Sequence, residues 1–461
     1  MSIAYTDFLA RKAVMLAPSG LSEIPSIHEG LFPHQRDSVE FALRRGRAAL
    51  FLDTGLGKSR AQAEWARIVA EHTGGDVLIL APLAVAAQTV REAAEIGVTI
   101  THCREPEDAR PGINIVNYDR VERFDCSRFA GVVLDESSIL KSFDGATKRM
   151  LVERFRATPY RLACTATPAP NDHMELGNHA EFLGLMQANE MLQRWFINDT
   201  STASQSWRLK GHAVEPFWDW VASWAFCVSR PSDLGYPDEG FALPELRLIR
   251  EMVETDRSVN TGGALFRMPE MSATSYHAEK RLTIAERAAR IGALIAAEPH
   301  EPWLVWCDTD YEADAIRDAA PSLVEVRGSQ SADEKERRLV AFSSGASRHL
   351  LTKPKIAGHG MNWQHCARVA FAGLSFSYEQ FYQAVRRCWR FGQTRPVHVH
   401  ICMAETELAL WDVISRKQND HDEMKTAMFE AVRRARRSTA QVRVAYNPTH
   451  KGALPRWLIA A

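Results

Sequence analysis

The sequence predicts an α/β fold with two parallel β-sheets, one in each half of the chain. Short apolar runs rich in β-branched residues alternate with stretches whose apolar residues recur at helical spacing. The runs are apolar at nearly every position, as expected for strands that are covered on both faces of a sheet. A chain of 461 residues, with 46% hydrophobic and 25% charged residues, is long enough for roughly two to four globular domains.

The first half contains five predicted strands, and the second half contains another five. The helix predicted after the first strand carries Ala63, Ala66 and Val69 on one stripe, which would face the sheet. The predicted strands are residues 48–53, 76–82, 113–118, 131–136 and 161–168 in the first half, and 303–308, 323–328, 349–354, 368–373 and 397–402 in the second.

Changes in composition divide the chain further. A segment between the two sheets is rich in Trp, Pro and polar residues, and it predicts a small helical insertion. We expect its Trp side chains to pack a core, although aromatic rings can also stack on bases. The predicted domains are an N-terminal segment (1–30), the first sheet domain (31–188), the insertion and linker (189–279), the second sheet domain (280–424) and a basic C-terminal tail (425–461).

The charge balance, the apolar runs and the cysteines indicate where in the cell the protein works. Lys and Arg number 56 and Asp and Glu number 57, so a net charge of −1 gives no overall positive field, although local patches can still form. No apolar run approaches the roughly 18 residues of a membrane span, and the N-terminus lacks the apolar core of a secretory signal. The eight cysteines include no CxxC pair. We therefore expect a cytoplasmic protein with no membrane partner.

A phosphate-binding loop is predicted where the strand 48–53 runs into TGLGKS and then a helix. Glycines let the backbone wrap around phosphate oxygens, and the helix start offers free N–H groups. Lys58 would reach the β- and γ-phosphates, and the Ser59 hydroxyl would ligate Mg²⁺. Leu52 stands where the generic motif has its first glycine. The candidate loop residues are Thr54, Gly55, Leu56, Gly57, Lys58 and Ser59.

An acidic pair follows another predicted strand. Asp135 and Glu136 lie at the carboxyl end of residues 131–136, where ligands of open α/β sheets bind. Asp135 would hold Mg²⁺, and Glu136 would orient and deprotonate an attacking water. Taken alone, such a pair would more often cap a turn. Thr165 and Thr167 follow a further strand, so their hydroxyls would lie beside the pair.

An arginine cluster is predicted on a helix of the second half. Gln383, Arg387 and Arg390 recur at helical spacing, so they can line one face. That face could deliver guanidinium groups to a γ-phosphate, as an arginine finger supplied by the same chain. The other interpretation is a solvated basic face with Trp389 in the core.

Together these motifs resemble superfamily 2 helicases, and most closely the Swi/Snf-like branch of DNA translocases in its compact bacterial or phage form. LFPHQ resembles the opening motif of the family, whose glutamine, here Gln35, reads adenine. DTGLGKS is similar to DExGLGKT, which also lacks the generic first glycine. DESSILKS is similar to DExHxxKN, and CTATPAPND to LTGTPxxN. The resemblance extends from about residue 31 to residue 403.

The second half carries two further motifs of the family. KIAGHGMNWQHCARV resembles GxGLNLxxAxxV, which makes Gly360 a candidate nucleotide contact. QAVRRCWRFGQ is similar to QAxDRxHRxGQ, with Arg386 at the family's Asp. The match implies two RecA-like lobes, with Arg387 and Arg390 as the arginines that contact ATP and Gln383 beside them.

The resemblance also implies that nucleic acid crosses both lobes. In this family loops at the sheet ends contact phosphates, so binding depends little on base sequence. The candidate contacts are Gln88, Lys141 and Lys353, and the RRARR stretch adds Arg433 and Arg434. The alternative for RRARR is a solvated helix end or a flexible tail.

The predicted function is an ATP-driven DNA translocase or helicase that uses ATP and Mg²⁺. We expect a monomer that works on duplex or single-stranded DNA, with replication, recombination or defence proteins as candidate partners. One alternative is an RNA helicase of the same superfamily, and another is a scaffold or nuclease accessory. A scaffold that does not hydrolyse ATP should have lost Lys58, Asp135 or Glu136, and all three are present. A P-loop kinase or GTPase would not need a distant arginine helix.

Overall fold

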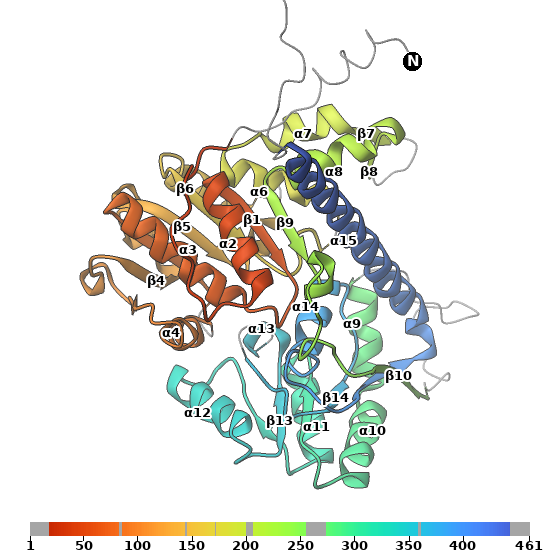
Figure 1. The fold of residues 1–461 in the computed structure, drawn as a ribbon. Coiled ribbons are helices and arrows are strands. Elements are labelled where there is room, and N and C mark those ends of the chain that lie inside the picture. Colours follow the sequence, from red (N-terminus) through yellow and green to blue (C-terminus); the bar gives the residue numbers. More distant parts are fainter. Residues whose placement is uncertain are drawn as a thin grey trace, which may run out of the picture.

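The computed structural model contains two α/β lobes, each built on a parallel sheet (Figure 1). It describes residues 18–82, 85–142, 145–170, 172–199, 206–254, 273–357 and 361–442. Within these ranges, no helix has the length and apolar character needed to cross a membrane. The predicted fold class is therefore confirmed at the level of two parallel sheets.

Lobe 1 has a seven-stranded parallel sheet in the order β3-β4-β2-β5-β6-β1-β9. Since β5, β6 and β1 are neighbours, their carboxyl ends bring the acidic pair, the two threonines and the phosphate loop to one edge. The strands are β1 (Arg47–Leu52), β2 (Asp76–Ala81), β3 (Ile100–His102), β4 (Ile113–Asn117), β5 (Phe129–Asp135), β6 (Tyr160–Cys164) and β9 (Ala225–Val228). The helices are α2 (Pro33–Arg45), α3 (Lys58–Thr73), α4 (Ala86–Ala94), α5 (Ala146–Arg154) and α6 (Glu175–Leu183).

Lobe 2 has a six-stranded parallel sheet in the order β10-β15-β14-β11-β13-β12. The strands are β10 (Leu246–Val253), β11 (Trp303–Trp306), β12 (Val324–Glu325), β13 (His349–Thr352), β14 (Arg368–Phe371) and β15 (Val397–Ala404). The helices are α9 (Ala273–Leu282), α10 (Ile284–Ala297), α11 (Asp310–Ala319), α12 (Ala332–Ser343), α13 (Pro354–Ala357) and α14 (Tyr378–Val385).

All ten predicted strands are present, most of them shortened by a residue or more at an end. The sequence did not predict β3, β9, β10 or the antiparallel pair of β7 (Phe196–Asp199) and β8 (Ser206–Leu209). β9 is only four residues long and lies in the Trp-rich segment, which was predicted to be helical. β10 is a half-exposed edge strand, so it lacks the continuous apolar run that marks the others.

The predicted insertion at residues 189–279 is partly built into the two sheets. β9 pairs with β1 of lobe 1, and β10 pairs with β15 of lobe 2. Four further elements, α7 (Ala188–Trp195), β7, β8 and α8 (Val214–Ala222), form the Trp-rich cluster beside lobe 1 (Figure 1). The exact domain boundaries stay a prediction.

The Trp-rich cluster is a packed core. Trp195, Trp218, Trp220 and Trp224 are buried, and only Trp207 is half-buried. The Trp195 and Trp220 rings lie 4.6 Å apart, and those of Trp220 and Trp224 lie 5.4 Å apart. The packing interpretation is confirmed for the four buried rings, because a ring enclosed by other side chains cannot stack on a base.

The predicted basic tail differs from the structure over residues 425–442. These residues continue α15 (Leu408–Val442), a 35-residue helix that runs along both lobes (Figure 1). Leu410 and Ile414 belong to the core of lobe 2, whereas Met424 and Met428 belong to the core of lobe 1. The apolar residues among the basic ones give this part of the helix a buried face, which a solvated tail would lack.

We predict that Trp220→Ala destabilises lobe 1 without a direct effect on nucleic-acid binding. Removal of a large buried ring costs about 3–5 kcal/mol of folding free energy. Chemical denaturation should show that loss, and Trp207→Ala should show a smaller one. A variant that keeps its stability but loses nucleic-acid binding would favour the base-stacking interpretation instead.

Candidate functional site

A cleft between the two lobes encloses a cavity of about 400 Å³. It brings together the predicted loop, the acidic pair and the arginine pair from opposite halves of the chain. Leu56 and Gln383 lie directly behind this lining, and Gly360 lies outside the described residues. The predicted ATP-site residues that line the cavity are Gln35, Thr54, Gly55, Gly57, Lys58, Ser59, Asp135, Glu136, Arg387 and Arg390.

The loop adopts a conformation that requires glycine. Gly55 and Gly57 have φ angles of 94° and 77°, in the region that other residues rarely adopt. A Cβ atom on Gly57 would lie only 2.1 Å from Nε2 of Gln35. Lys58 begins α3, and its Nζ atom donates a hydrogen bond to the Leu52 carbonyl at 3.0 Å. The first backbone N–H groups of a helix have no partner within it, so those at the start of α3 can bind an anion.

The Gln35 side chain holds the phosphate loop in place through hydrogen bonds. Its Nε2 atom donates to the Leu56 carbonyl at 2.9 Å, and its Oε1 atom accepts from the Phe32 N–H at 3.0 Å. The side chain is buried, yet it lines the cavity. One N–H and one lone pair of the amide remain for a ligand, since an amide offers two of each.

The acidic pair is held at the end of β5. Gln62 donates to Oδ1 of Asp135 at 2.8 Å, and Thr165 donates to Oε2 of Glu136 at 3.3 Å. The Thr167 N–H in turn donates to Oγ1 of Thr165 at 3.1 Å. Glu136 has a φ of 54°, and no other non-glycine residue in the described chain has a positive φ. Such strain is typical of functional positions.

The charged groups of lobe 1 that line the cleft shift one another's pKa values. Burial and the neighbouring Glu136 raise the pKa of Asp135 to about 6, although Gln62 and Lys58 oppose the shift. Burial also lowers the pKa of Lys58, against the attraction of Glu136 and Asp135. Two adjacent carboxyl groups with only one lysine nearby favour a further cation. Mg²⁺ fits this donor set together with the Ser59 hydroxyl.

The arginine pair faces the cleft from lobe 2. Arg387 donates from Nη2 to Oε1 of Gln383 at 2.8 Å and from Nη1 to the Met361 carbonyl at 3.3 Å, and Nη1 of Arg390 donates to the same carbonyl at 3.2 Å. Among the described residues, neither arginine has an acidic side chain within ion-pair distance. Burial, with the nearby charge of Arg390, lowers the pKa of Arg387 to about 10. The buried Arg387 and the partly exposed Arg390, each without an acidic side chain within ion-pair distance among the described residues, favour an anion between the lobes.

Three aromatic side chains that the sequence did not predict line the mouth of the cavity. Phe32, Phe241 and Phe391 come from before α2, from the linker and from after α14. The Phe32 and Phe241 rings lie 5.1 Å apart, and those of Phe241 and Phe391 lie 4.8 Å apart. A Cβ atom on Gly55 would lie 2.9 Å from the Phe391 nitrogen, so lobe 2 touches the loop directly. We call these three residues the aromatic rim.

The structure does not gather the five candidate nucleic-acid contacts on one surface. Gln88 lines the cleft cavity, and Lys141 forms an ion pair with Glu379 of lobe 2. Arg434 pairs with Asp219 of α8 at 2.7 Å, whereas Arg433 is exposed. Gln88 donates a hydrogen bond to Glu92 on the same helix, whereas the partners of Lys141 and Arg434 lie in elements distant in sequence.

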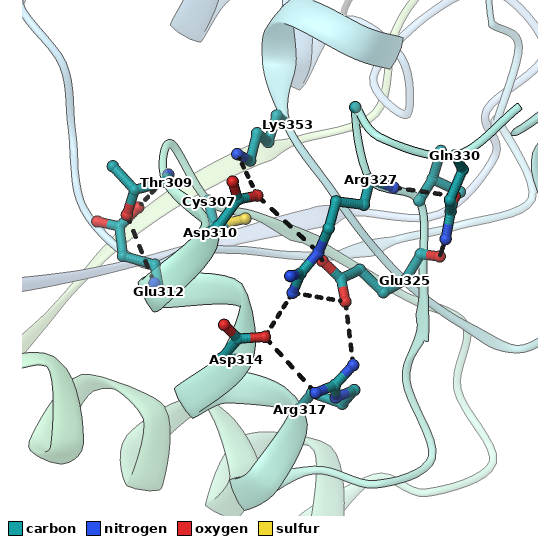
Figure 2. Close-up of polar contacts among 12 residues, drawn as sticks. Cys307, Thr309, Asp310, Glu312, Asp314, Arg317, Glu325, Arg327, Gln330 and Lys353 are labelled. Carbon is teal, nitrogen blue, oxygen red and sulfur yellow. Dashed lines mark hydrogen bonds and ion pairs between the residues drawn. The ribbon is translucent and has the colours of Figure 1, made fainter.

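Lys353 lies in a different environment, at the carboxyl ends of the lobe 2 strands. It lines a cavity of about 490 Å³ together with Lys280 and Lys355. Lys353 forms an ion pair with Asp310 at the start of α11, at a distance of 2.8 Å between Nζ and Oδ1 (Figure 2). Beside it, Arg327 pairs with Glu325 and other acidic residues. An incoming phosphate would therefore compete with the exposed carboxylate of Asp310.

Comparisons with known proteins agree with this arrangement. Residues 286–392 match the helicase conserved C-terminal domain. The fold is similar to S. cerevisiae Dbp5 bound to RNA and ADP BeF3, with a TM-score of 0.52, 13% sequence identity, and coverage of 87% of this chain and 98% of that chain. No curated protein matches the sequence. At this identity the structural likeness shows the fold alone, which is that of two RecA-like helicase lobes. The domain match, over residues 286–392, is likewise to a helicase domain.

We predict that Asp135→Asn stabilises the protein when no nucleotide or metal is present. Because the folded state raises the pKa of Asp135 to about 6, its ionisation weakens the fold as the pH rises from the ordinary carboxyl value. Thermal unfolding of the variant should therefore occur at a higher temperature than in the unaltered protein above about pH 6. The difference should fade as the pH falls through that window. Mg²⁺ with a nucleotide should stabilise only the unaltered protein, and a lower unfolding temperature of the variant at neutral pH would contradict this.

Proposed function

We propose that the protein is an ATP-driven motor that moves along DNA, a translocase or helicase of the Swi/Snf-like branch. The cleft carries this proposal, because two arginines face a glycine loop and an acidic pair across it, and neither has an ion-pair partner among the described residues. That arrangement suits a polyphosphate with a divalent cation. The order of the sequence motifs supports the choice of branch.

The loop would bind the phosphates of ATP in lobe 1. The backbone of residues 54–59 wraps the phosphate oxygens, and Lys58 exchanges its bond to the Leu52 carbonyl for one to the β- and γ-phosphates. Ser59 and Asp135 would hold Mg²⁺, which neutralises phosphate charge when it is bound. The free N–H and lone pair of Gln35 suit the edge of adenine, and the aromatic rim offers a face on which the base can stack.

Hydrolysis would be assembled from both lobes. Glu136, held by Thr165, orients a water and accepts its proton while the water oxygen bonds to the γ-phosphorus. The bond from that phosphorus to the ADP oxygen breaks. Arg387 and Arg390 stabilise the negative charge that develops, and Gln383 orients Arg387. Thr165 and Thr167 would couple this step to the rest of lobe 1.

Movement would follow from opening and closing of the cleft. ATP draws the arginine pair towards lobe 1, and loss of the γ-phosphate releases it. Lys353, in the cavity that it shares with Lys280 and Lys355, would contact the nucleic-acid backbone in lobe 2. Local contacts of this kind agree with a net charge of −1, because they need no overall positive field. We expect a monomer in the cytoplasm that serves replication, recombination or defence proteins.

RNA is the second candidate substrate. Dbp5, with a similar fold, was solved bound to RNA. The GLGKS loop and the motif around Arg387 favour the DNA branch, and they are sequence features of this chain itself. DNA is therefore our first choice.

We predict that Lys58→Ala abolishes ATP turnover and that Glu136→Gln lowers kcat by about 10²- to 10⁴-fold. Lys58→Ala removes the cation at the phosphates, whereas Glu136→Gln removes the base and should still bind ATP. Phosphate release measures both, and circular dichroism checks that the fold survives. Glu71→Gln, on the exposed side of α3, is the control and should retain turnover. Any hydrolysis in Lys58→Ala, or stimulated hydrolysis near the unaltered rate in Glu136→Gln, would disprove the assignment.

We predict that DNA stimulates ATP turnover more than RNA of the same length and sequence. The measurement compares single-stranded DNA, duplex DNA and RNA at one salt concentration, because phosphate contacts depend strongly on salt. Strand-displacement and triplex-displacement assays then separate unwinding from translocation. Stimulation by RNA alone would transfer the proposal to the RNA helicase.

A further inference from the structure

We propose that Asp53, Arg386 and Lys425 are positioning residues that form an interlobe latch, which holds the arginine pair of lobe 2 over the phosphate loop. In this proposal α15 is the strap that carries the third member of the latch across both lobes. The inference rests on the proposed ATP hydrolysis and adds to it the elements that set the closed geometry of the cleft.

The latch is centred on the carboxylate of Asp53, between the end of β1 and the loop. Oδ1 lies 2.5 Å from Nη2 of Arg386, and Oδ2 lies 3.0 Å from Nζ of Lys425. The Tyr382 hydroxyl donates to the same carboxylate, and so does the Thr54 N–H, at 2.6 Å. Arg386 and Lys425, which both follow Asp53 by more than three hundred residues in the sequence, thus meet at its carboxylate.

These charges are almost completely removed from water. The side chains of Arg386, Asp53 and Lys425 are 6%, 11% and 12% exposed. Although burial opposes it, the cations of Arg386 and Lys425 hold the pKa of Asp53 well below its usual range. If one partner were removed, a buried charge would lose its counter-ion, which strongly disfavours that arrangement of the lobes.

The latch connects directly to the arginine pair. Arg386 precedes Arg387 in the chain, and the two side chains point to different partners, Asp53 and Gln383. The Arg386 guanidinium also lies 4.8 Å from the centre of the Trp389 ring. Trp389 in turn donates from Nε1 to the Pro244 carbonyl of the linker at 2.7 Å. A shift of Arg386 therefore moves the backbone that carries Arg387 and Arg390.

Lys425 lies where α15 passes from one lobe to the other. Before it, Lys417 donates to the Phe376 carbonyl of lobe 2 at 3.1 Å. After it, Met428 is buried in the core of lobe 1, and Arg436 pairs with Asp37 of α2 at 2.8 Å. Figure 1 shows the helix as one continuous rod from lobe 2 to α8. The lobes can separate only if the latch opens and the later part of α15 leaves lobe 1 or the helix bends.

The latch makes a specific kinetic prediction. Lobe 1 holds the phosphate loop and Gln35, so loss of the latch should change ATP binding little. The arginine pair acts on the charge of the transition state, so its displacement should lower kcat. A displacement of about 1 Å can cost up to roughly a hundredfold in rate.

The experiment compares Lys425→Met, Lys425→Arg and Lys148→Met with the unaltered full-length protein. Lys425 lies outside the cleft cavity, so its loss does not remove a ligand contact. Lys148→Met is the matched control, because it removes a buried lysine that pairs with Glu181 at 2.7 Å inside lobe 1. We expect Lys425→Met to lower kcat about tenfold or more with KM for ATP within about threefold, and Lys425→Arg to restore most of it. Lys148→Met should lower thermal stability without lowering kcat in this way.

Small-angle X-ray scattering without nucleotide provides a second readout. Lys425→Met should increase the radius of gyration, and Lys148→Met should not. An unchanged kcat and scattering profile would overturn the latch, and a higher kcat would show that α15 restrains hydrolysis instead. If the unaltered protein hydrolyses no ATP, the proposed function fails, while scattering still decides whether the latch closes the lobes.

Discussion

The carboxylate of Asp53 is buried between the lobes, and a buried charge is tolerated only where cations and hydrogen bonds pair with it. Arg386 from lobe 2 and Lys425 from α15 supply the cations. Because Asp53 directly precedes the phosphate loop and Arg386 directly precedes Arg387, this cluster fixes the two sides of the cleft relative to each other. The contact of Phe391 with Gly55 and the course of α15 along both lobes depend on the same closed arrangement.

The charges at Asp53 are paired, whereas the arginine pair and the acidic pair inside the cleft form no ion pair within the described part of the chain. The arginine pair has no acidic partner among the described residues, and the pKa of Asp135 is raised because burial and Glu136 disfavour its charge. Each lobe therefore presents a set of charges that its own side chains leave unbalanced. A polyphosphate with a divalent cation would satisfy both sets at once, and neither lobe could do this alone. The closed cleft is thus prepared for a ligand at some cost to the stability of the empty protein.

The parts that the sequence predicted are those with a local signal. The ten strands are mostly apolar runs, and the loop, the acidic pair and the arginine pair are short motifs. The sheet order of lobe 1 brings the loop and the acidic pair together, and the cleft between the lobes adds the arginine pair. The aromatic rim was not predicted in this way. Phe32 and Phe391 stand in two of the motifs, but the three rings come from separate segments that only the fold brings together. Apolar spacing in residues 424–432 indicates a buried face, but it does not say which lobe covers that face. Lys141 was predicted from the family resemblance and Arg434 from its basic stretch, and the acidic partners of both lie in other elements.

A buried ion-pair cluster suits a contact that must form and break in every cycle. The desolvation of the charges offsets much of their attraction, so the net contribution of such a cluster to stability is small. Its geometry is nevertheless well defined, because two cations and a hydroxyl must meet one carboxylate. An apolar interface of the same size would favour closure more strongly. It would also define the positions of the arginines less well. The latch therefore specifies where lobe 2 docks without making the docked state too stable to reopen.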